Sequence, residues 1–219
     1  MFRRVRKFFG KAPVQLNPKE AYNLWSESYD TERNPVKSFS DNMVSEYLPE
    51  MKDKALLDVG CGTGHACKLA LDHGAARVLG LDISENMIIK ARKLIPSDKA
   101  EFRTISEKQS FVVDEPFDVA VCALVLAHTD DPNLILHSIY DALRPDGILI
   151  ITDFHPHAAH QGMKRSFDHH GVTYTVTHHT HTLETYRGML EDTGFTCLQH
   201  NEASWLNTPV VFAMQCQKK

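Results

Sequence analysis

The sequence predicts a single α/β domain, residues 1–219, whose mostly parallel sheet is covered by helices on both faces. Three observations carry this prediction. Apolar runs of strand length alternate with helix-like segments, a glycine-rich turn follows the first run, and the run at 117–124 is apolar along most of its length. Alternating strands and helices favour parallel pairing, and strands buried on both faces form continuous apolar runs. With 219 residues the chain suffices for one such domain with a sizeable core.

Residues 1–50 are expected to form a helical cap, because Pro18 lies near a helix start and Tyr22, Trp25 and Tyr29 recur at helical spacing. Residues 51–154 are expected to form the ligand-binding half of the sheet. Ser84 is a typical N-cap residue and Gly74 a typical C-cap residue. The expected strands are 55–59, 77–81, 101–104, 117–124 and 148–152, and the expected helices are 64–73, 85–94 and 132–143, with a turn at 144–147.

Residues 155–181 read as an insertion after the fifth strand, and we expect it to form a flap over the substrate, since loops at the carboxyl ends of strands carry binding residues in this kind of fold. Within it, the segments 164–168 and 172–177 read as a hairpin, because Val172, Tyr174 and Val176 alternate with threonines. Residues 182–219 then close the domain with a helix at 183–192 and two antiparallel strands at 195–199 and 210–216.

The composition is that of an ordinary soluble globular protein, with 42% hydrophobic and 24% charged residues. A net charge of −4 argues against nucleic acid as the main partner. Five cysteines without a C-x-x-C pair indicate reduced thiols and a cytoplasmic protein. The first nine residues are basic and aromatic, which leaves three readings open: a peripheral contact with an anionic membrane, a targeting segment, or a solvated tail.

The most specific motif is the turn Asp58-Val59-Gly60-Cys61-Gly62-Thr63-Gly64. Glycines at a strand-to-helix turn adopt positive φ without steric cost and let the backbone approach a ligand closely. The dinucleotide fingerprint requires its third glycine three positions after the second, where this chain has His65. Asp58, two residues before the first glycine, suits a positively charged cofactor better than a pyrophosphate.

This turn resembles motif I of the class I S-adenosylmethionine-dependent methyltransferases, D/E-x-G-x-G-x-G, and matches it position for position. The resemblance implies a Rossmann-like, seven-stranded sheet whose last two strands form an antiparallel hairpin. It also implies S-adenosyl-L-methionine as cofactor and S-adenosyl-L-homocysteine as product. The glycines would approach the methionine part of the cofactor, and Asp58 would help to orient its amino group.

Asp82 ends the second strand about 20 residues after the glycine turn, where a carboxylate can accept hydrogen bonds from both ribose hydroxyls. The resemblance implies this role, with Ile83 beside the adenine. In this family a Gly-Asp-Ala-like turn usually follows the third strand, and in the matching stretch 104–107 its acid is missing or shifted by a residue or two. Backbone groups of Ile105 and Ser106, or Glu107, remain candidates for the adenine contact. The predicted cofactor-binding residues are Tyr29, Asp58, Gly60, Cys61, Gly62, Gly64, Asp82, Ile83, Met87, Ile105, Ser106 and Ala123. For Tyr29 the alternative is a core aromatic.

The segment after the fourth strand lacks the Asn-Pro-Pro-Tyr box of amino-directed methyltransferases and looks like small-molecule enzymes of the ubiquinone- and biotin-pathway type. His128 then lies near the acceptor and is either a general base or a residue that caps the following turn. His155, His157 and His178 are the predicted substrate contacts in the histidine-rich flap. No metal is expected, because no cysteine pair supports zinc and few carboxylates lie near.

Together these observations predict methyl transfer to a small molecule by direct SN2 displacement. Two alternatives remain: a nicotinamide-dependent oxidoreductase, and a non-catalytic binding protein that keeps the fold. Asp58, the glycine spacing and the lack of a Tyr-x-x-x-Lys pair count against the first, and the intact glycine turn counts against the second. The sequence sets neither the accepting atom nor the oligomeric state.

Overall fold

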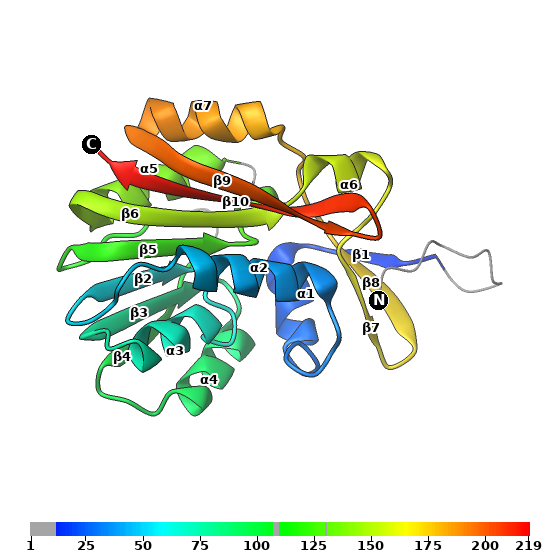
Figure 1. Ribbon diagram of the computed structural model, residues 1–219. Coiled ribbons are helices and arrows are strands. Elements are labelled where there is room, and N and C mark those ends of the chain that lie inside the picture. The colour runs from blue at the N-terminus through cyan, green and yellow to red at the C-terminus, as the bar shows by residue number, and fades with distance from the viewer. Residues whose placement is uncertain (1–11, 107–109, 130) are drawn as a thin grey trace.

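The computed structural model describes residues 12–106, 110–129 and 131–219, and it confirms the predicted seven-stranded sheet (Figure 1). The strand order is β4-β3-β2-β5-β6-β10-β9, in which the first five strands are parallel and the last two form an antiparallel hairpin. The strands are β2 (Ala55–Val59), β3 (Arg77–Asp82), β4 (Ala100–Thr104), β5 (Phe117–Ala123), β6 (Leu143–Phe154), β9 (Phe195–Trp205) and β10 (Thr208–Lys218).

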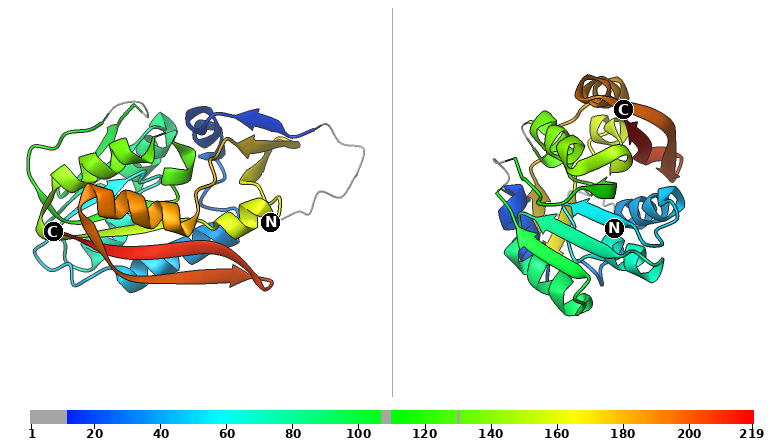
Figure 2. Two further views of the ribbon diagram at one scale, coloured as in Figure 1. Left: turned by 90° about the horizontal axis from the view of Figure 1, so that it is seen from above. Right: turned by 90° about the vertical axis from the view of Figure 1, so that its left-hand side faces the viewer.

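Helices cover both faces of this sheet (Figures 1 and 2). Successive side chains of a strand point to opposite faces, so Leu56 packs in the core under one layer of helices and Leu57 in the core under the other. The first layer contains α2 (Pro35–Tyr47), α3 (His65–Asp72) and α4 (Glu85–Leu94). The second contains α5 (Pro132–Ala142) and α7 (Leu183–Thr193).

Local capping signals set the helix ends where the sequence predicted them. The Ser84 hydroxyl accepts a hydrogen bond from the backbone N–H of Met87 at 3.2 Å, and α4 spans the predicted residues 85–94. Gly74 follows α3 with φ +88°, a left-handed conformation that glycine adopts without strain. The Asp131 carboxylate caps α5 by accepting from Asn133 N at 3.1 Å.

Three strands, β6, β9 and β10, exceed their predicted bounds by more than one residue. The pairing of β5 with β6 passes from Phe117–Leu143 to Val119–Ile148, so the expected turn at 144–147 is a bulge within β6. The strands β9 and β10 continue to a two-residue turn at Leu206 and Asn207, both with positive φ. Residues 200–205 are mostly exposed and polar, and therefore lack the apolar pattern by which strands are recognised.

A second, three-stranded sheet lies beyond the carboxyl ends of the parallel strands, at the right of Figure 1. The predicted flap hairpin is confirmed as β7 (Ser166–His169) and β8 (Val172–Val176). The wholly helical cap is wrong for β1 (Val14–Leu16), which pairs in parallel with β8. This strand lies before α1 (Pro18–Trp25), and α6 (Pro156–His160) follows β6.

Within the residues that the structure describes, no helix has the length and apolar character needed to cross a membrane. Residues 1–9, for which a membrane contact was one sequence-based reading, lie outside the described part of the chain.

Candidate active site

A cleft of about 800 Å³ opens at the carboxyl ends of the parallel strands, bordered by α1 and the loops after β2, β3, β4 and β5. The strand order reverses between β2 and β5, and such a switch point is where open α/β sheets bind their ligands. Many predicted site residues meet in its lining: Tyr29, Gly60, Gly62, Asp82, Ile83, Met87, Ile105, Ser106, Ala123 and His128. Glu107 lies outside the described residues.

The glycine turn forms one wall of the cleft. Gly60 and Gly62 have φ of +74° and +52°, which glycine adopts most readily. A Cβ atom at Gly60 would overlap the Val125 side chain, whereas one at Gly62 would meet only the Tyr29 ring, at 3.9 Å. The backbone of Gly62 is therefore open to a ligand, with Tyr29 as the nearest side chain across that space.

Asp82 lines the cleft at the end of β3. Its Oδ2 accepts from the backbone N–H of Gly62 and its Oδ1 from that of Ser84, both at 2.8 Å. Burial raises the pKa of Asp82 to about 6, and these two N–H donors oppose that rise. The carboxylate is consequently mainly ionised at neutral pH, is held in place, and retains lone pairs for hydroxyl groups of a ligand.

Asp58 lies behind the glycine turn rather than in the cleft lining. The side chain is 2% exposed within β2, and the Cys67 thiol donates to its Oδ2 at 3.6 Å. Burial raises the pKa of Asp58 to about 7. Cys61 and Gly64 also lie outside the lining, and Gly64 starts α3 with φ +90°. These three residues are buried and are not among the residues that line the cleft, so their cofactor contacts remain predictions.

His128 links three parts of the molecule. Its Nδ1 lies 2.8 Å from the Thr177 carbonyl, and its Nε2 lies 3.0 Å from the Tyr22 hydroxyl. A carbonyl can only accept, so Nδ1 carries the proton and Nε2 accepts from Tyr22. Burial holds the pKa of His128 well below its ordinary value. The ring is neutral, and the lone pair on Nε2 already accepts the hydrogen bond from the Tyr22 hydroxyl.

The capping role considered for His128 belongs to other residues. The Thr129 hydroxyl accepts from Asp131 N at 3.3 Å, and Asp131 itself caps α5. Sequence reasoning also missed Tyr22 as a cleft residue, because helical spacing alone made it a core aromatic.

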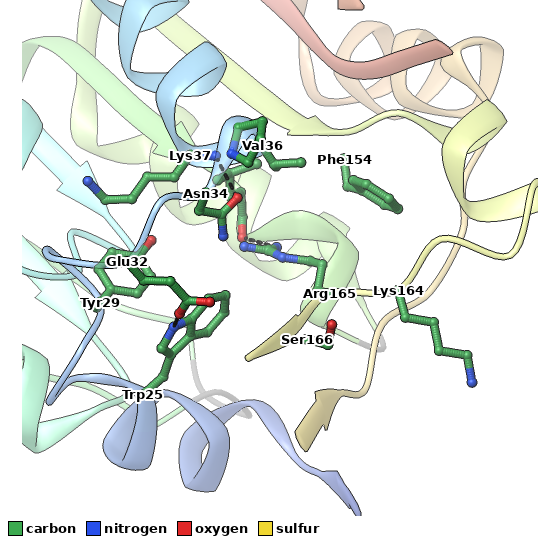
Figure 3. A pocket seen from close by; sticks show the side chains of 12 residues that line it. Trp25, Tyr29, Glu32, Asn34, Val36, Lys37, Phe154, Lys164, Arg165 and Ser166 are labelled. Carbon is green, nitrogen blue, oxygen red and sulfur yellow. Dashed lines mark hydrogen bonds between the residues drawn. The ribbon is translucent and has the colours of Figure 1, made fainter. Parts of the chain in front are cut away.

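A second cavity of about 500 Å³ adjoins the cleft (Figure 3). The linings of the two cavities share Tyr29, Leu124 and Arg165. Arg165 precedes β7, and its Nη1 donates to the Leu124 carbonyl at 2.9 Å. Leu124 has φ +61°, an uncommon conformation for a residue other than glycine. Sequence reasoning missed both residues. The other residues of the wall are Trp25, Glu32, Asn34, Pro35, Val36, Lys37, Phe154, Lys164 and Ser166.

The three histidines predicted to contact substrate lie outside the linings of both cavities, so the structure does not place them at the site. His155 caps α6 by accepting from His157 N at 3.1 Å, and its Nε2 faces Glu202 at 3.3 Å. His178 packs edge-on against Phe154, with ring centroids 6.1 Å apart. Because His155 continues the pairing of β6 with β10, its side chain is directed at β9 rather than at the cleft.

Among the described residues, the His155–His160 segment does not form a compact group of metal-ligating atoms. A different group does: the ligand atoms of Glu27, His169 and His170 lie within 4.8 Å of one another. They join the end of the flap hairpin to the loop after α1. Glu27 and His170 are exposed, and none of the three lines either cavity.

A family model described as a methyltransferase domain matches residues 36–200. An uncharacterized protein of Haemophilus influenzae is 31% identical over 142 residues, covering 60% of this chain and 56% of its own. A ubiquinone biosynthesis O-methyltransferase of Hydrogenovibrio crunogenus is 32% identical over 100 residues, covering 44% and 41%. The chain thus spans about half the length of these curated relatives. An S-adenosylmethionine dependent methyltransferase structure from Mesorhizobium loti shares the fold, with TM-score 0.69, 22% identity, and 84% and 100% of the two chains covered.

Proposed function

Because the chain belongs to the methyltransferase domain family, we propose that it transfers a methyl group from S-adenosyl-L-methionine to a small molecule. The observation that carries the proposal is the Asp82 carboxylate, held by the N–H groups of Gly62 and Ser84 beside an open glycine turn. Family membership and the relative named a ubiquinone biosynthesis O-methyltransferase both favour this function over a nicotinamide-dependent oxidoreductase.

The cleft fits the cofactor at both ends. Asp82 would accept hydrogen bonds from the ribose hydroxyls, and the apolar side chains of Ile83, Met87 and Ile105 would surround the adenine. Gly62 and Tyr29 would hold the methionine part, since the space over Gly62 is open up to the Tyr29 ring. Bound S-adenosyl-L-methionine supplies an electrophilic methyl group for SN2 displacement by the acceptor.

The protein's own contribution is mainly alignment, which can supply much of the reduction in barrier. Tyr29, Leu124 and Arg165 lie where the cleft meets the second cavity, so this junction is the place for the acceptor atom. The flap closes one side, because the Thr177 carbonyl after β8 is bonded to His128. Excluding water at this junction favours the acceptor as the nucleophile.

His128 acts in this proposal as a positioning residue. Burial raises the pKa of Tyr22 to about 12, so Tyr22 keeps its proton and its hydroxyl donates a hydrogen bond to His128 Nε2. For His128 to serve as the general base, an acceptor hydroxyl must replace the Tyr22 hydroxyl at Nε2. Until then, the pair holds α1 and the flap against the loop after β5.

Calorimetric titration of the full chain with S-adenosyl-L-homocysteine tests the proposal. We expect micromolar binding, and Asp82→Asn should weaken it by at least about tenfold, because a hydrogen bond to a charged group contributes about 1.5–3 kcal/mol. Asp118→Asn is the matched control. The Asp118 carboxylate also accepts a backbone N–H, from Ala55 at 2.8 Å, but lies at the opposite end of the strands.

Two results would contradict the proposed function. One is the absence of binding of either S-adenosyl-L-methionine or S-adenosyl-L-homocysteine by the folded protein. The other is an affinity that falls equally in the Asp82→Asn and Asp118→Asn variants.

A further inference from the structure

We propose that the acceptor carries an anionic group, and that Arg165 binds this group in the second cavity. The inference rests on the proposed function, since it names the class of molecule that this site methylates. The acceptor would be an aromatic or apolar molecule with a carboxylate or a phosphate. Its body would lie among the Trp25, Val36 and Phe154 side chains that line the cavity.

Arg165 carries a buried guanidinium that borders both cavities. The residue is 7% exposed, yet it lines both the cleft and the second cavity. Its hydrogen bond runs from Nη1 to the Leu124 carbonyl, and in the described part of the chain it forms no ion pair with a carboxylate. A guanidinium has five N–H donors, and buried charges in proteins are normally paired. The remaining donors therefore suit an anion in the cavity.

The charged side chains near Arg165 in the cavity wall bond to other residues or point away from the cavity centre. Lys37 Nζ pairs with Asp41 at 3.2 Å, and the Lys164 side chain points away from the cavity centre in Figure 3. Glu32 accepts from Trp25 Nε1 at 2.8 Å. Among the described residues that line the cavity, Arg165 is thus the cation directed into it, as Figure 3 shows.

Asp153 is the buried acid whose charge acts on Arg165, and it too has other partners. Its Oδ2 accepts from Ala127 N at 2.8 Å and from the Tyr186 hydroxyl at 3.1 Å. Its Oδ1 accepts from Phe154 N at 2.7 Å. This carboxylate stabilises the arginine from within the core without occupying its donors.

The hydrogen bond to the Leu124 carbonyl fixes the position of the Arg165 side chain. Leu124 holds an uncommon backbone conformation, φ +61°, in which its carbonyl accepts from Arg165 Nη1. Strained backbone of this kind is concentrated at ligand-binding sites. An anion on Arg165 would therefore hold the acceptor at the junction of the two cavities, next to Tyr29. Bidentate binding by an arginine would set the orientation of the molecule as well as its affinity.

The test uses the full chain saturated with S-adenosyl-L-homocysteine, titrated with benzoate, phenyl phosphate and benzamide. Benzamide has the shape of benzoate without its charge. We expect at least one of the two anions to bind about tenfold more tightly than benzamide. The stronger of the two identifies the anionic group as a carboxylate or a phosphate.

Arg165→Gln should weaken binding of that anion about tenfold or more, while the glutamine amide can still donate to the Leu124 carbonyl. Arg165→Lys, which keeps the charge, should lose less. Arg92→Gln is the control, because Arg92 also donates to a main-chain carbonyl, that of Phe102 at 2.6 Å, but lines neither cavity. Retained binding of S-adenosyl-L-homocysteine shows that each variant is folded.

Three results would overturn the inference and leave the proposed function intact. The wild-type protein could bind S-adenosyl-L-homocysteine but neither anion, or it could bind benzamide as tightly as the anions. The third result is equal anion affinity in wild type and Arg165→Gln. If Arg165→Gln does not fold, two results together would have the same meaning. The anion would bind wild type and Arg165→Lys with equal affinity, and wild type would bind benzamide as tightly as the anion. Failure of the wild type to bind S-adenosyl-L-homocysteine would instead contradict the proposed function.

Discussion

At the scale of single residues, two buried carboxylates lie on either side of the glycine turn. Asp82 is held by two backbone N–H groups, whereas Asp58 is paired with the weak thiol donor of Cys67. Burial raises the pKa of both, to about 6 and about 7. Acids with raised pKa values cluster at functional sites, where stability is traded for chemistry. Asp58 thus destabilises the folded chain at neutral pH.

This cost predicts a specific pH dependence. The pKa of Asp58 is about 7 in the folded protein against a usual value of 3.8, so at intermediate pH the folded state holds a proton that the unfolded state has released. The free energy of unfolding therefore decreases as pH rises through this interval. Asp58→Asn removes this dependence, and its stability relative to wild type should rise by about 2–3 kcal/mol between about pH 5 and pH 8. Urea unfolding at several pH values measures it, and a constant difference would refute it.

At the scale of elements, the strands of the flap pair with the N-terminal segment, and hydrogen bonds of Thr177 and Arg165 connect the flap to the loop after β5. Phe167 of β7 stacks on Trp25 of α1, with ring centroids 4.8 Å apart and planes at 7°. The strand β1 adds main-chain pairing, from Val14–Tyr174 to Leu16–Val176. The small sheet, α1 and their shared aromatic core form a separate hydrophobic cluster. The flap and the cap should therefore open and close as one unit.

Phe167→Ala tests this coupling. Removing a buried phenylalanine costs about 3–5 kcal/mol where the site cannot collapse. We expect faster amide hydrogen exchange in β7, β8 and β1 together, with protection in β2 and β5 unchanged. Val172→Ala is the control, because Val172 lies on the same hairpin but is 36% exposed. Faster exchange in β7 and β8 with β1 unaffected would show that the two parts move independently.

What could be predicted from the sequence follows from how local each signal is. The helix 85–94 was predicted to the residue because Ser84 caps it from one position away. The glycine turn and Asp82 were placed because adjacent residues and short strand ends define them. The strand β1 was missed because it pairs with β8, where Val176 lies opposite Leu16, and the two strands are far apart in the sequence.

In the candidate site too, residues marked by local sequence signals were predicted, and residues placed by long-range packing were not. Gly62, Asp82 and Ile105 belong to the cofactor half and were named from the sequence, and they line the cleft. Arg165 carries no sequence motif, and its proposed role rests on burial without a carboxylate partner among the described residues. The flap histidines were favoured by their number, but pairing of β6 with β10 directs His155 to Glu202 instead. Long-range packing, not composition, decides which flap residues reach the site.

At the scale of the whole molecule, the large sheet and the small sheet border different parts of the proposed site. The carboxyl ends of the parallel strands form the cleft proposed for the cofactor, and the cap and flap close the second cavity proposed for the acceptor. The two spaces meet at Tyr29, Leu124 and Arg165. A methyl group passing between two ligands requires such a junction, because both reacting atoms must be in contact.

A crystal structure of the full chain with S-adenosyl-L-homocysteine tests this account most directly. The account predicts the ligand in the cleft, with its ribose hydroxyls bonded to Asp82, its adenine beside Ile83 and Ile105, and its sulfur facing the junction with the second cavity. A ligand that occupies the second cavity, or whose ribose lies away from Asp82, would contradict it.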